Sequence, residues 1–303
     1  MYCTMMKNLN CTKLIVALFA LCLVACEKPV LTDDSSQENP TSEDLYRLTF
    51  RMSHYEQIPF EEGLKLSRST NITKMCTRID LAIFKEGTKV KAIHQSQKDT
   101  NFGVIEANLP VGSYQIVAIA HSGDGSATIT SPEAISFPKN KLTDTFYYIQ
   151  NITVGENKTY DLEMKRAVAM FRLITIDKIP DAVQKIKFYY TGGSSTFNAL
   201  TGYGCKNSRQ TEERSVAKEQ RNGQGTFDVF TFPHEKTDAL KMTVSALNAT
   251  GDVITEHKFL EVPVKPNQIT QYKGAFFQNT SSMEANHFTF FVNEQWTQQE
   301  YPY

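Results

Sequence analysis

The cysteine at position 26 stands in a sequence context that predicts a specific covalent reaction. Leu23, Val24 and Ala25 precede it, so a branched apolar residue and two smaller residues lead up to a thiol. This order resembles the lipobox of bacterial lipoproteins, where the thiol takes a diacylglyceryl group as a thioether and the preceding peptide bond is cut. We therefore predict cleavage between Ala25 and Cys26 and lipidation of Cys26 with acyl chains such as palmitate.

The segment before Cys26 has the parts of an export signal. Lys7 and Lys13 make its start positive, and residues 14–24 form an uninterrupted apolar run. A membrane-spanning helix needs about 20 apolar residues, so this run is short for a span. We predict a lipoprotein signal peptide over residues 1–25, the alternative being an ordinary secretory signal that contains cysteines.

The other cysteines do not indicate a disulfide framework. Three of the six cysteines leave with the signal and Cys26 is lipidated, so Cys76 and Cys205 remain as thiols. They could pair with each other, or each could be buried separately in its own part of the fold.

Other reactive side chains lack the spacing that catalysis needs. Ser194 and Ser195 follow two glycines, but a nucleophile elbow requires glycine two residues to each side of the serine, so we interpret residues 192–196 as a turn. The six histidines are scattered singly, without metal-ligand spacing. We interpret the paired carboxylates as solvated surface: Asp33–Asp34, Glu61–Glu62 and Glu212–Glu213. The sequence therefore predicts no enzyme, no metal and no cofactor.

Composition points to a folded protein that does not bind nucleic acid. The 303 residues carry a formal net charge of -1 and are 41% hydrophobic and 11% aromatic, which is typical of a globular chain. A nucleic-acid-binding protein usually has a strongly basic surface, and this balance of charge excludes one.

A polar segment follows Cys26. Residues 26–44 are rich in Ser, Thr, Pro, Asp and Glu and nearly lack apolar side chains. Such a segment buries too little surface to fold, so we predict a lipidated, flexible tether.

The rest of the chain shows short strand patterns without helices between them. A hairpin is predicted at residues 248–252, a turn at 121–125 and a long polar loop at 204–225. This pattern is typical of antiparallel β-sandwiches, and its length favours two in tandem, at residues 45–163 and 164–303. The predicted strands are residues 78–85, 113–121, 145–149, 167–176, 185–190, 226–232, 241–247 and 253–259.

Three stretches carry a resemblance to a known family. Residues 161–171, 185–204 and 262–274 resemble the fimbrillin-B-like family of Bacteroidales lipoprotein anchor and minor fimbrial subunits, within the fimbrillin superfamily. The likeness extends over residues 78–291 and is most specific in the C-terminal half. It implies an all-β fold of two transthyretin-like sandwich domains, held by lipid at the cell outer membrane and associated with a fimbrium at the cell surface.

The resemblance also implies partners and a function. Family members are expected to seat or regulate a fimbrium by exchanging β-strands with shaft or accessory pilin subunits, a form of strand addition at an open sheet edge. We therefore expect a non-enzymatic fimbrial anchor or accessory subunit. The alternative is a surface lipoprotein that binds host glycan or protein outside any fimbrium.

Two segments are relevant to strand exchange. Phe288, Phe290 and Val292 alternate near the C-terminus and predict a candidate exchanged strand, the alternative being an ordinary closing strand. Residues 45–52 predict the first strand of the fold. An anchor is expected to keep that strand, because cleavage there would release the chain from its lipid.

Replacing Cys26 tests the lipidation. In the producing bacterium, Cys26→Ala is expected to abolish incorporation of labelled fatty acid, because alanine has no thiol to form the thioether. Cys22→Ala is the matched control and should label like the unaltered chain. Labelling of the Cys26→Ala chain would contradict the assignment of Cys26.

Overall fold

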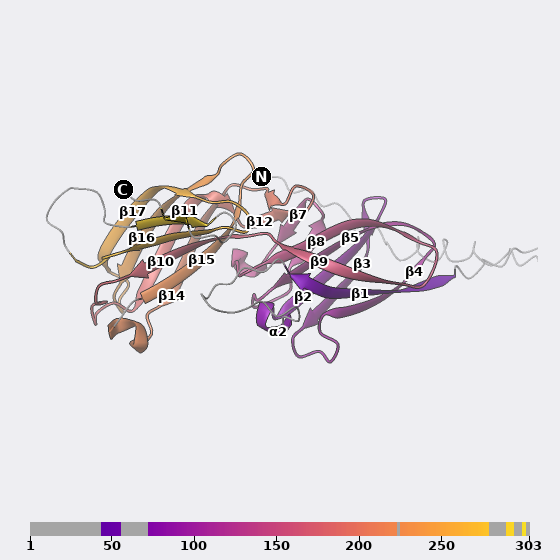
Figure 1. Ribbon diagram of the computed structural model, residues 1–303, viewed down its shortest axis with the longest axis horizontal. Helices are drawn as coiled ribbons and strands as arrows, with labels where there is room; N and C mark the ends of the chain where they lie inside the picture. Colours follow the sequence, from indigo (N-terminus) through magenta and orange to yellow (C-terminus); the bar gives the residue numbers. More distant parts are fainter. Residues whose placement is uncertain (1–43, 56–71, 223–224, 279–288, 294–298, 301–303) are drawn as a thin grey trace, which may run out of the picture. The chain divides into compact units, whose positions relative to one another are not determined.

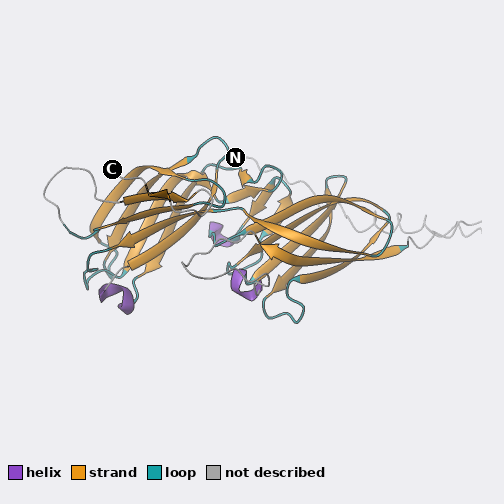
Figure 2. Ribbon diagram, viewed as in Figure 1, coloured by secondary structure: helices purple, strands orange, loops and turns teal. Residues whose placement is uncertain are grey.

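Strands dominate the fold. The computed structural model describes residues 44–55, 72–222, 225–278, 289–293 and 299–300 of the chain, which belong to one compact unit. Its helices are single turns: α2 (Ile72–Met75), η1 (Pro138–Asn140) and η2 (Lys218–Asn222), as Figure 2 shows. The all-β class is confirmed.

Several predicted features lie outside the described residues, namely the signal peptide, the tether, Cys26 and Phe288. Among the residues that are described, no helix is long and apolar enough to cross a membrane.

The first sandwich contains seven strands in the order β3-β2-β5-β8-β9-β1-β4. Strands β8 and β9 share only two residue pairs, so the chain passes there from the β3-β2-β5-β8 layer to the β9-β1-β4 layer. The strands are β1 (Leu45–Tyr55), β2 (Arg78–Lys85), β3 (Thr88–Ser96), β4 (Val104–Pro110), β5 (Gly112–His121), β8 (Phe146–Val154) and β9 (Lys158–Arg166).

Strand β1 is central to this sandwich. Leu48, Phe50 and Met52 alternate inward into the core between the layers, and Phe50 is fully buried and stacks on Tyr160. Strand β1 runs antiparallel to β4 on one side and parallel to β9 on the other (Figure 1). The intervening Arg51 is exposed, as expected for a strand with one buried face.

The second sandwich repeats this arrangement. One layer contains β14, β11, β16 and β17, and the other contains β15, β10, β18, β19 and β20. As in the first sandwich, the first strand, β10, runs parallel to a late strand, β18. The strands are β10 (Ala169–Thr175), β11 (Lys185–Ser194), β14 (Ser208–Ser215), β15 (Gly225–Pro233), β16 (Ala239–Leu247), β17 (Val253–Pro263), β18 (Ile269–Gly274), β19 (Thr289–Asn293) and β20 (Gln299–Glu300).

Short strands contribute to a third apolar cluster, which draws on both halves of the chain. Phe84 and Val117 from the outer face of the first sandwich pack in it with Phe197 and Phe232. Strand pairing also joins the halves, because β7 pairs with β12. The short strands are β6 (Thr128–Ser131), β7 (Ala134–Ser136), β12 (Thr196–Asn198) and β13 (Tyr203–Gly204).

Two stretches differ from the sequence prediction. Residues 192–196 were interpreted as a turn, but residues 192–194 continue β11 and Thr196 begins β12. Strand β11 has a bulge here, where Gly192 takes a φ of 97°, a conformation that glycine adopts without strain. The predicted loop at 204–225 contains β14. Its polar residues can form a strand because the buried ones have partners.

Glu212 on β14 was predicted to be solvated, and this prediction is wrong. The residue is buried, and its carboxylate accepts hydrogen bonds from Lys141 Nζ at 3.0 Å and Arg214 Nη1 at 3.1 Å. Glu213 is half exposed beside Lys185, as its alternation with Glu212 on the strand requires.

The two predicted thiols do not form a disulfide. Cys76 is buried beside the Tyr55 hydroxyl, and burial raises the pKa of its thiol to about 12. Cys205 is exposed, contrary to the expectation of two buried thiols, and partial burial still raises the pKa of its thiol above the ordinary value. Neither thiol is activated as a nucleophile.

Truncating a core residue of β1 tests its structural role. Phe50→Ala is expected to lower the free energy of unfolding by about 3–5 kcal/mol, because it leaves a cavity between the layers. Arg51→Ala, on the exposed face of the same strand, should change it by less than about 0.5 kcal/mol. Denaturant unfolding measures both, and equal effects would show that β1 is not part of the core.

Candidate functional site

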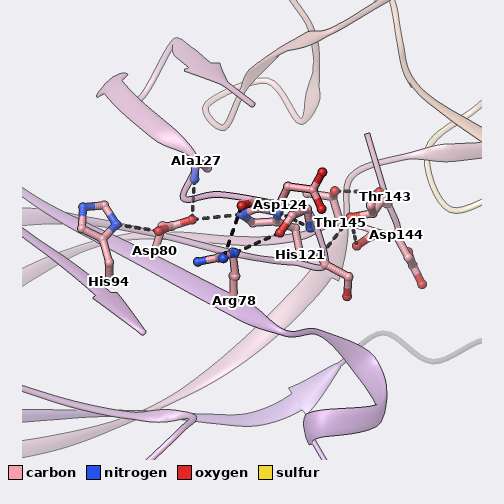
Figure 3. Close-up of polar contacts among 11 residues, drawn as sticks. Arg78, Asp80, His94, His121, Asp124, Ala127, Thr143, Asp144 and Thr145 are labelled. Carbon is pink, nitrogen blue, oxygen red and sulfur yellow. Dashed lines mark hydrogen bonds and ion pairs between the residues drawn. The ribbon is translucent and has the colours of Figure 1, made fainter. Parts of the chain in front are cut away.

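A buried carboxylate on β2 is the centre of the main polar cluster. Asp80 is fully buried, and strand register places His94 of β3 directly opposite it. His121, at the end of β5, reaches the same carboxylate from the other side (Figure 3). The sequence interpretation treated these histidines as isolated, since they are far apart in the chain.

Three donors surround the Asp80 carboxylate. One oxygen lies 2.5 Å from His94 Nδ1, and the other lies 3.1 Å from His121 Nε2. The backbone N–H of Ala127 donates to the second oxygen at 2.7 Å. The carboxylate thus has hydrogen-bond partners in place of the water that burial removes.

The hydrogen bonds of His121 fix its protonation. The N–H of Gly123 donates to Nδ1 at 3.0 Å, so this nitrogen carries no proton. The proton is therefore on Nε2, from which the neutral imidazole donates to Asp80. His121 is only 1% exposed, so exchange with solvent water does not compete with these bonds.

The environment of Asp80 favours its charged form. Burial raises the pKa of the carboxyl, but the hydrogen bonds from His121, His94 and the Ala127 amide outweigh this effect, and the net pKa is below the ordinary value. Asp80 is therefore ionised throughout the neutral range.

The cluster holds the turn between β5 and β6 in place. Arg78 Nε donates to the Gly123 carbonyl at 2.9 Å, and the Ser122 N–H donates to Thr143 Oγ1 at 2.9 Å. Together with the Ala127 bond, these contacts fix both ends of residues 122–127, which include most of the turn predicted at residues 121–125. The cluster thus substitutes for the regular backbone pairing that a turn lacks.

His121 is not placed to act as the base of a hydrolytic site. A catalytic histidine needs a ring nitrogen free to take a proton from a nucleophile, and the second nitrogen of His121 is occupied by Gly123. Ser194 is equally committed: its hydroxyl donates to the Thr196 carbonyl and accepts from the Lys206 amide. In the described part of the chain, no three His, Cys, Asp or Glu side chains are grouped to hold a metal ion.

An open groove of about 350 Å³ lies at the other end of the first sandwich. Gln115 and Asn151 face each other across β5 and β8, with the amide of one donating to the other at 3.1 Å. Glu86 and Ser113 add a carboxylate and a hydroxyl to the lining. Paired amides and hydroxyls suit a neutral polar ligand better than an ion.

The candidate exchanged strand forms an edge ladder in this structure. Strand β19 pairs antiparallel with β18, with Phe290 opposite Tyr272 and Val292 opposite Thr270. Strand exchange by these residues stays a prediction, since pairing at home is also what an ordinary closing strand shows.

The chain is fixed just before this C-terminal segment. Three consecutive backbone N–H groups, of Phe276, Phe277 and Gln278, donate to the Asp177 carboxylate at 2.9, 2.6 and 2.9 Å. His257 Nε2 lies 2.9 Å from the Phe276 carbonyl, and the Phe276 ring is fully buried. The core of the second sandwich is therefore closed before β19 begins.

Replacing Asp80 tests the cluster. Asp80→Asn is expected to lower the free energy of unfolding at pH 7 by about 1–3 kcal/mol. The N–H₂ group of the asparagine would face one of the donors that now bind the carboxylate, and two donors cannot form a hydrogen bond with each other. The pKa of Asp80 is lower in the folded protein than in the unfolded chain, where it is about 3.9. Ionised Asp80 therefore stabilises the fold at pH values above about 3.9, and this stability is lost as the pH falls through the pKa of the folded protein. The difference between the two proteins should accordingly narrow below about pH 4.

Denaturant unfolding over a pH series measures this difference. Asp124→Asn, at an exposed position in the adjacent turn, is the matched control and should be nearly neutral. A gap between Asp80→Asn and the unaltered protein that stays constant down to pH 2 would contradict the ionised state of Asp80.

Solved structures with similar folds come from Bacteroidales. A candidate polysaccharide-binding protein (DUF1812) of Bacteroides thetaiotaomicron has a TM-score of 0.52 at 10% identity, over 85% of this chain and 98% of its own. A candidate adhesin from the same species has a TM-score of 0.46 at 13% identity, over 75% and 90%. The fimbrial anchor protein Mfa2 of Porphyromonas gingivalis has a TM-score of 0.42 at 11% identity, over 82% and 98%.

At 10% identity, the likeness to the polysaccharide-binding protein is one of fold. None of the curated proteins matches this sequence. One family model matches residues 41–301, nearly the whole region after the predicted signal and tether. The chain therefore belongs to that family, the family of unknown function DUF6562.

Proposed function

We propose that this protein is a non-enzymatic outer-membrane lipoprotein that seats or regulates a fimbrium at the cell surface. Cys26 carries the acyl chains, and residues 26–44 form the tether to the folded part. The partners are fimbrial shaft or accessory pilin subunits. The fold shared with an adhesin and a fimbrial anchor supports this proposal at the level of architecture.

The observation that carries the proposal is the complete first sandwich. Strand β1 occupies the position between β9 and β4, and its side chains Leu48 and Phe50 are fully buried. The chain therefore fills this site with its own first strand and needs no strand from a partner. A subunit that keeps this strand also keeps its connection to Cys26, which is what an anchor requires.

Exchange is then assigned to the other end of the chain. Strand β19 covers the edge of β18, and its departure would expose a row of unpaired backbone N–H and C=O groups. In the exchange that we propose, β19 leaves this edge and pairs with a pilin. The Asp177 contacts leave the rest of the second sandwich closed when β19 departs.

The two sandwiches are proposed as separate domains that meet at residues 163 and 164. Their cores support two domains but shift the join a few residues further on, since Met164 packs in the first core, β9 runs to Arg166, and the second core begins at Ala169. The third cluster, which includes Phe84 and Phe232, gives the two domains a common buried surface.

Removal of residues 279–303 tests the exchange. In the producing bacterium, the full chain is expected to co-purify with pilin from detergent-solubilised outer membrane, as an SDS-resistant, heat-sensitive ladder. The shortened chain is expected to lose that pilin, because β18 would have no strand to exchange. The matched control lacks only residues 299–303, keeps β19 and should retain the ladder.

The outcomes separate the alternatives. Retention of pilin by the chain that lacks residues 279–303 would rule out exchange through β19. A full chain that never carries pilin would rule out the fimbrial role and favour a surface lipoprotein that binds glycan. The groove at Gln115 and Asn151 is the place for such a ligand, since paired amides match the hydroxyls of a sugar.

A further inference from the structure

The strand directions in the two sandwiches point to a mechanical function. We propose that the folded part of this chain is a load-bearing link that resists tension applied between its two ends. The proposal rests on the proposed function only for the source of the pull, which is a fimbrium attached to an anchored chain. The resistance itself follows from strand register.

The first parallel pair opposes a pull on the N-terminal end. Strand β1 pairs with β9 from Leu48 opposite Lys158 to Tyr55 opposite Met164. A pull enters β1 at its N-terminal end and leaves β9 at its C-terminal end. In a parallel pair these ends lie at opposite ends of the ladder, so the strands are pulled along their axes and all their hydrogen bonds are loaded together.

The second parallel pair repeats this arrangement. Strand β10 pairs with β18 from Met170 opposite Ile269 to Thr175 opposite Gly274. The pull enters at the start of β10 and leaves at the end of β18, again in shear. Tension therefore meets two such ladders in series.

Sliding is also opposed by burial. A shift of one residue along the ladder would turn Leu48, Phe50 and Met52 away from the core and Arg51 toward it. The same shift in β10 would turn out Phe171 and Leu173. Because both strands lie inside their sheets, each is held by a ladder on either side.

The short connection between the two ladders is fixed to both halves. Arg166, at the end of β9, is only 4% exposed, and its guanidinium binds both oxygens of Asp144 at 2.7 and 2.9 Å. It also donates to the Asn267 side chain at 3.1 Å. The Ala167 amide donates to the Thr145 carbonyl at 2.9 Å. The load thus passes between ladders without a free linker.

The C-terminal segment is arranged to separate at low force, in contrast to the two parallel ladders. Asn293 of β19 lies opposite Ile269, at the end of the ladder where β10 also begins. A pull on the chain beyond β19 opens this antiparallel pair one residue pair at a time, which needs less force. The load then reaches residues 276–278, which are held by Asp177.

Force spectroscopy on single molecules tests the proposal without damaging the core. Residues 27–303 in a Cys205→Ser background are held either at their two ends or through cysteines at positions 45 and 111. Leu45 and Val111 are 62% and 59% exposed, and Leu45 lies opposite Pro110, so the second geometry peels β1 from β4. The same protein and the same strand are thus pulled in shear and in peeling.

We expect end-to-end pulling to require at least about twofold more force than peeling, because the bonds of a sheared ladder must break together. Extension of the C-terminal segment should precede this event at low force. End-to-end forces equal to or below the peeling force would overturn the proposal. A resistant chain that never co-purifies with pilin would instead contradict only the fimbrial role, so the two failures are distinguishable.

Discussion

Parallel pairing of the first and last core strands is the constraint on which both sandwiches depend. Strand β8 lies in one layer, and β9 and β1 lie in the other. The chain therefore crosses between the layers from β8 to β9, and this crossing places β9 beside β1. The same pairing places the N-terminal end and the exit of each sandwich at opposite ends of one ladder. This parallel pairing therefore determines how the core closes, which path the chain takes and in which direction a load acts on the strands.

The polar cluster around Asp80 has a subordinate structural role. It stabilises a turn that cannot form regular backbone pairs, and its carboxylate is buried with three donors. A histidine beside a buried aspartate resembles part of a catalytic site, but the orientation of His121 is set by Gly123, leaving no free ring nitrogen. The cluster orders the chain near the common apolar surface of the two halves.

The sequence was informative where burial follows the strand period. The stretches that became β2 and β5 alternate or are continuously apolar, and their predicted bounds agree with the structure to within one residue. Strand β3 escaped prediction because it is an edge strand with an exposed face, where lysines replace apolar residues. Strand β14 was missed because its buried positions are Gln210 and Glu212, whose partners come from distant segments.

The candidate sites could not be predicted from the sequence for the same reason, because they join residues that are far apart in the chain. The meeting of His94, His121 and Asp80 depends on the register of three strands, which no local pattern specifies. The Asp177 contacts join residues about a hundred positions apart in sequence. The prediction for Cys26 needs no strand register, because it rests on four neighbouring residues, Leu23 to Cys26.

The pairing of Leu48 with Lys158 has a further consequence, for the order in which the chain folds. The first strand can pair with β4 earlier, but its second ladder cannot form until the last strand of its sandwich is present, and loop closure over this distance is slow. Each sandwich therefore remains incomplete until its final strand is available for pairing. The parallel pairing that is proposed to resist pulling in the finished protein also delays its folding until nearly the whole of each sandwich has been synthesised.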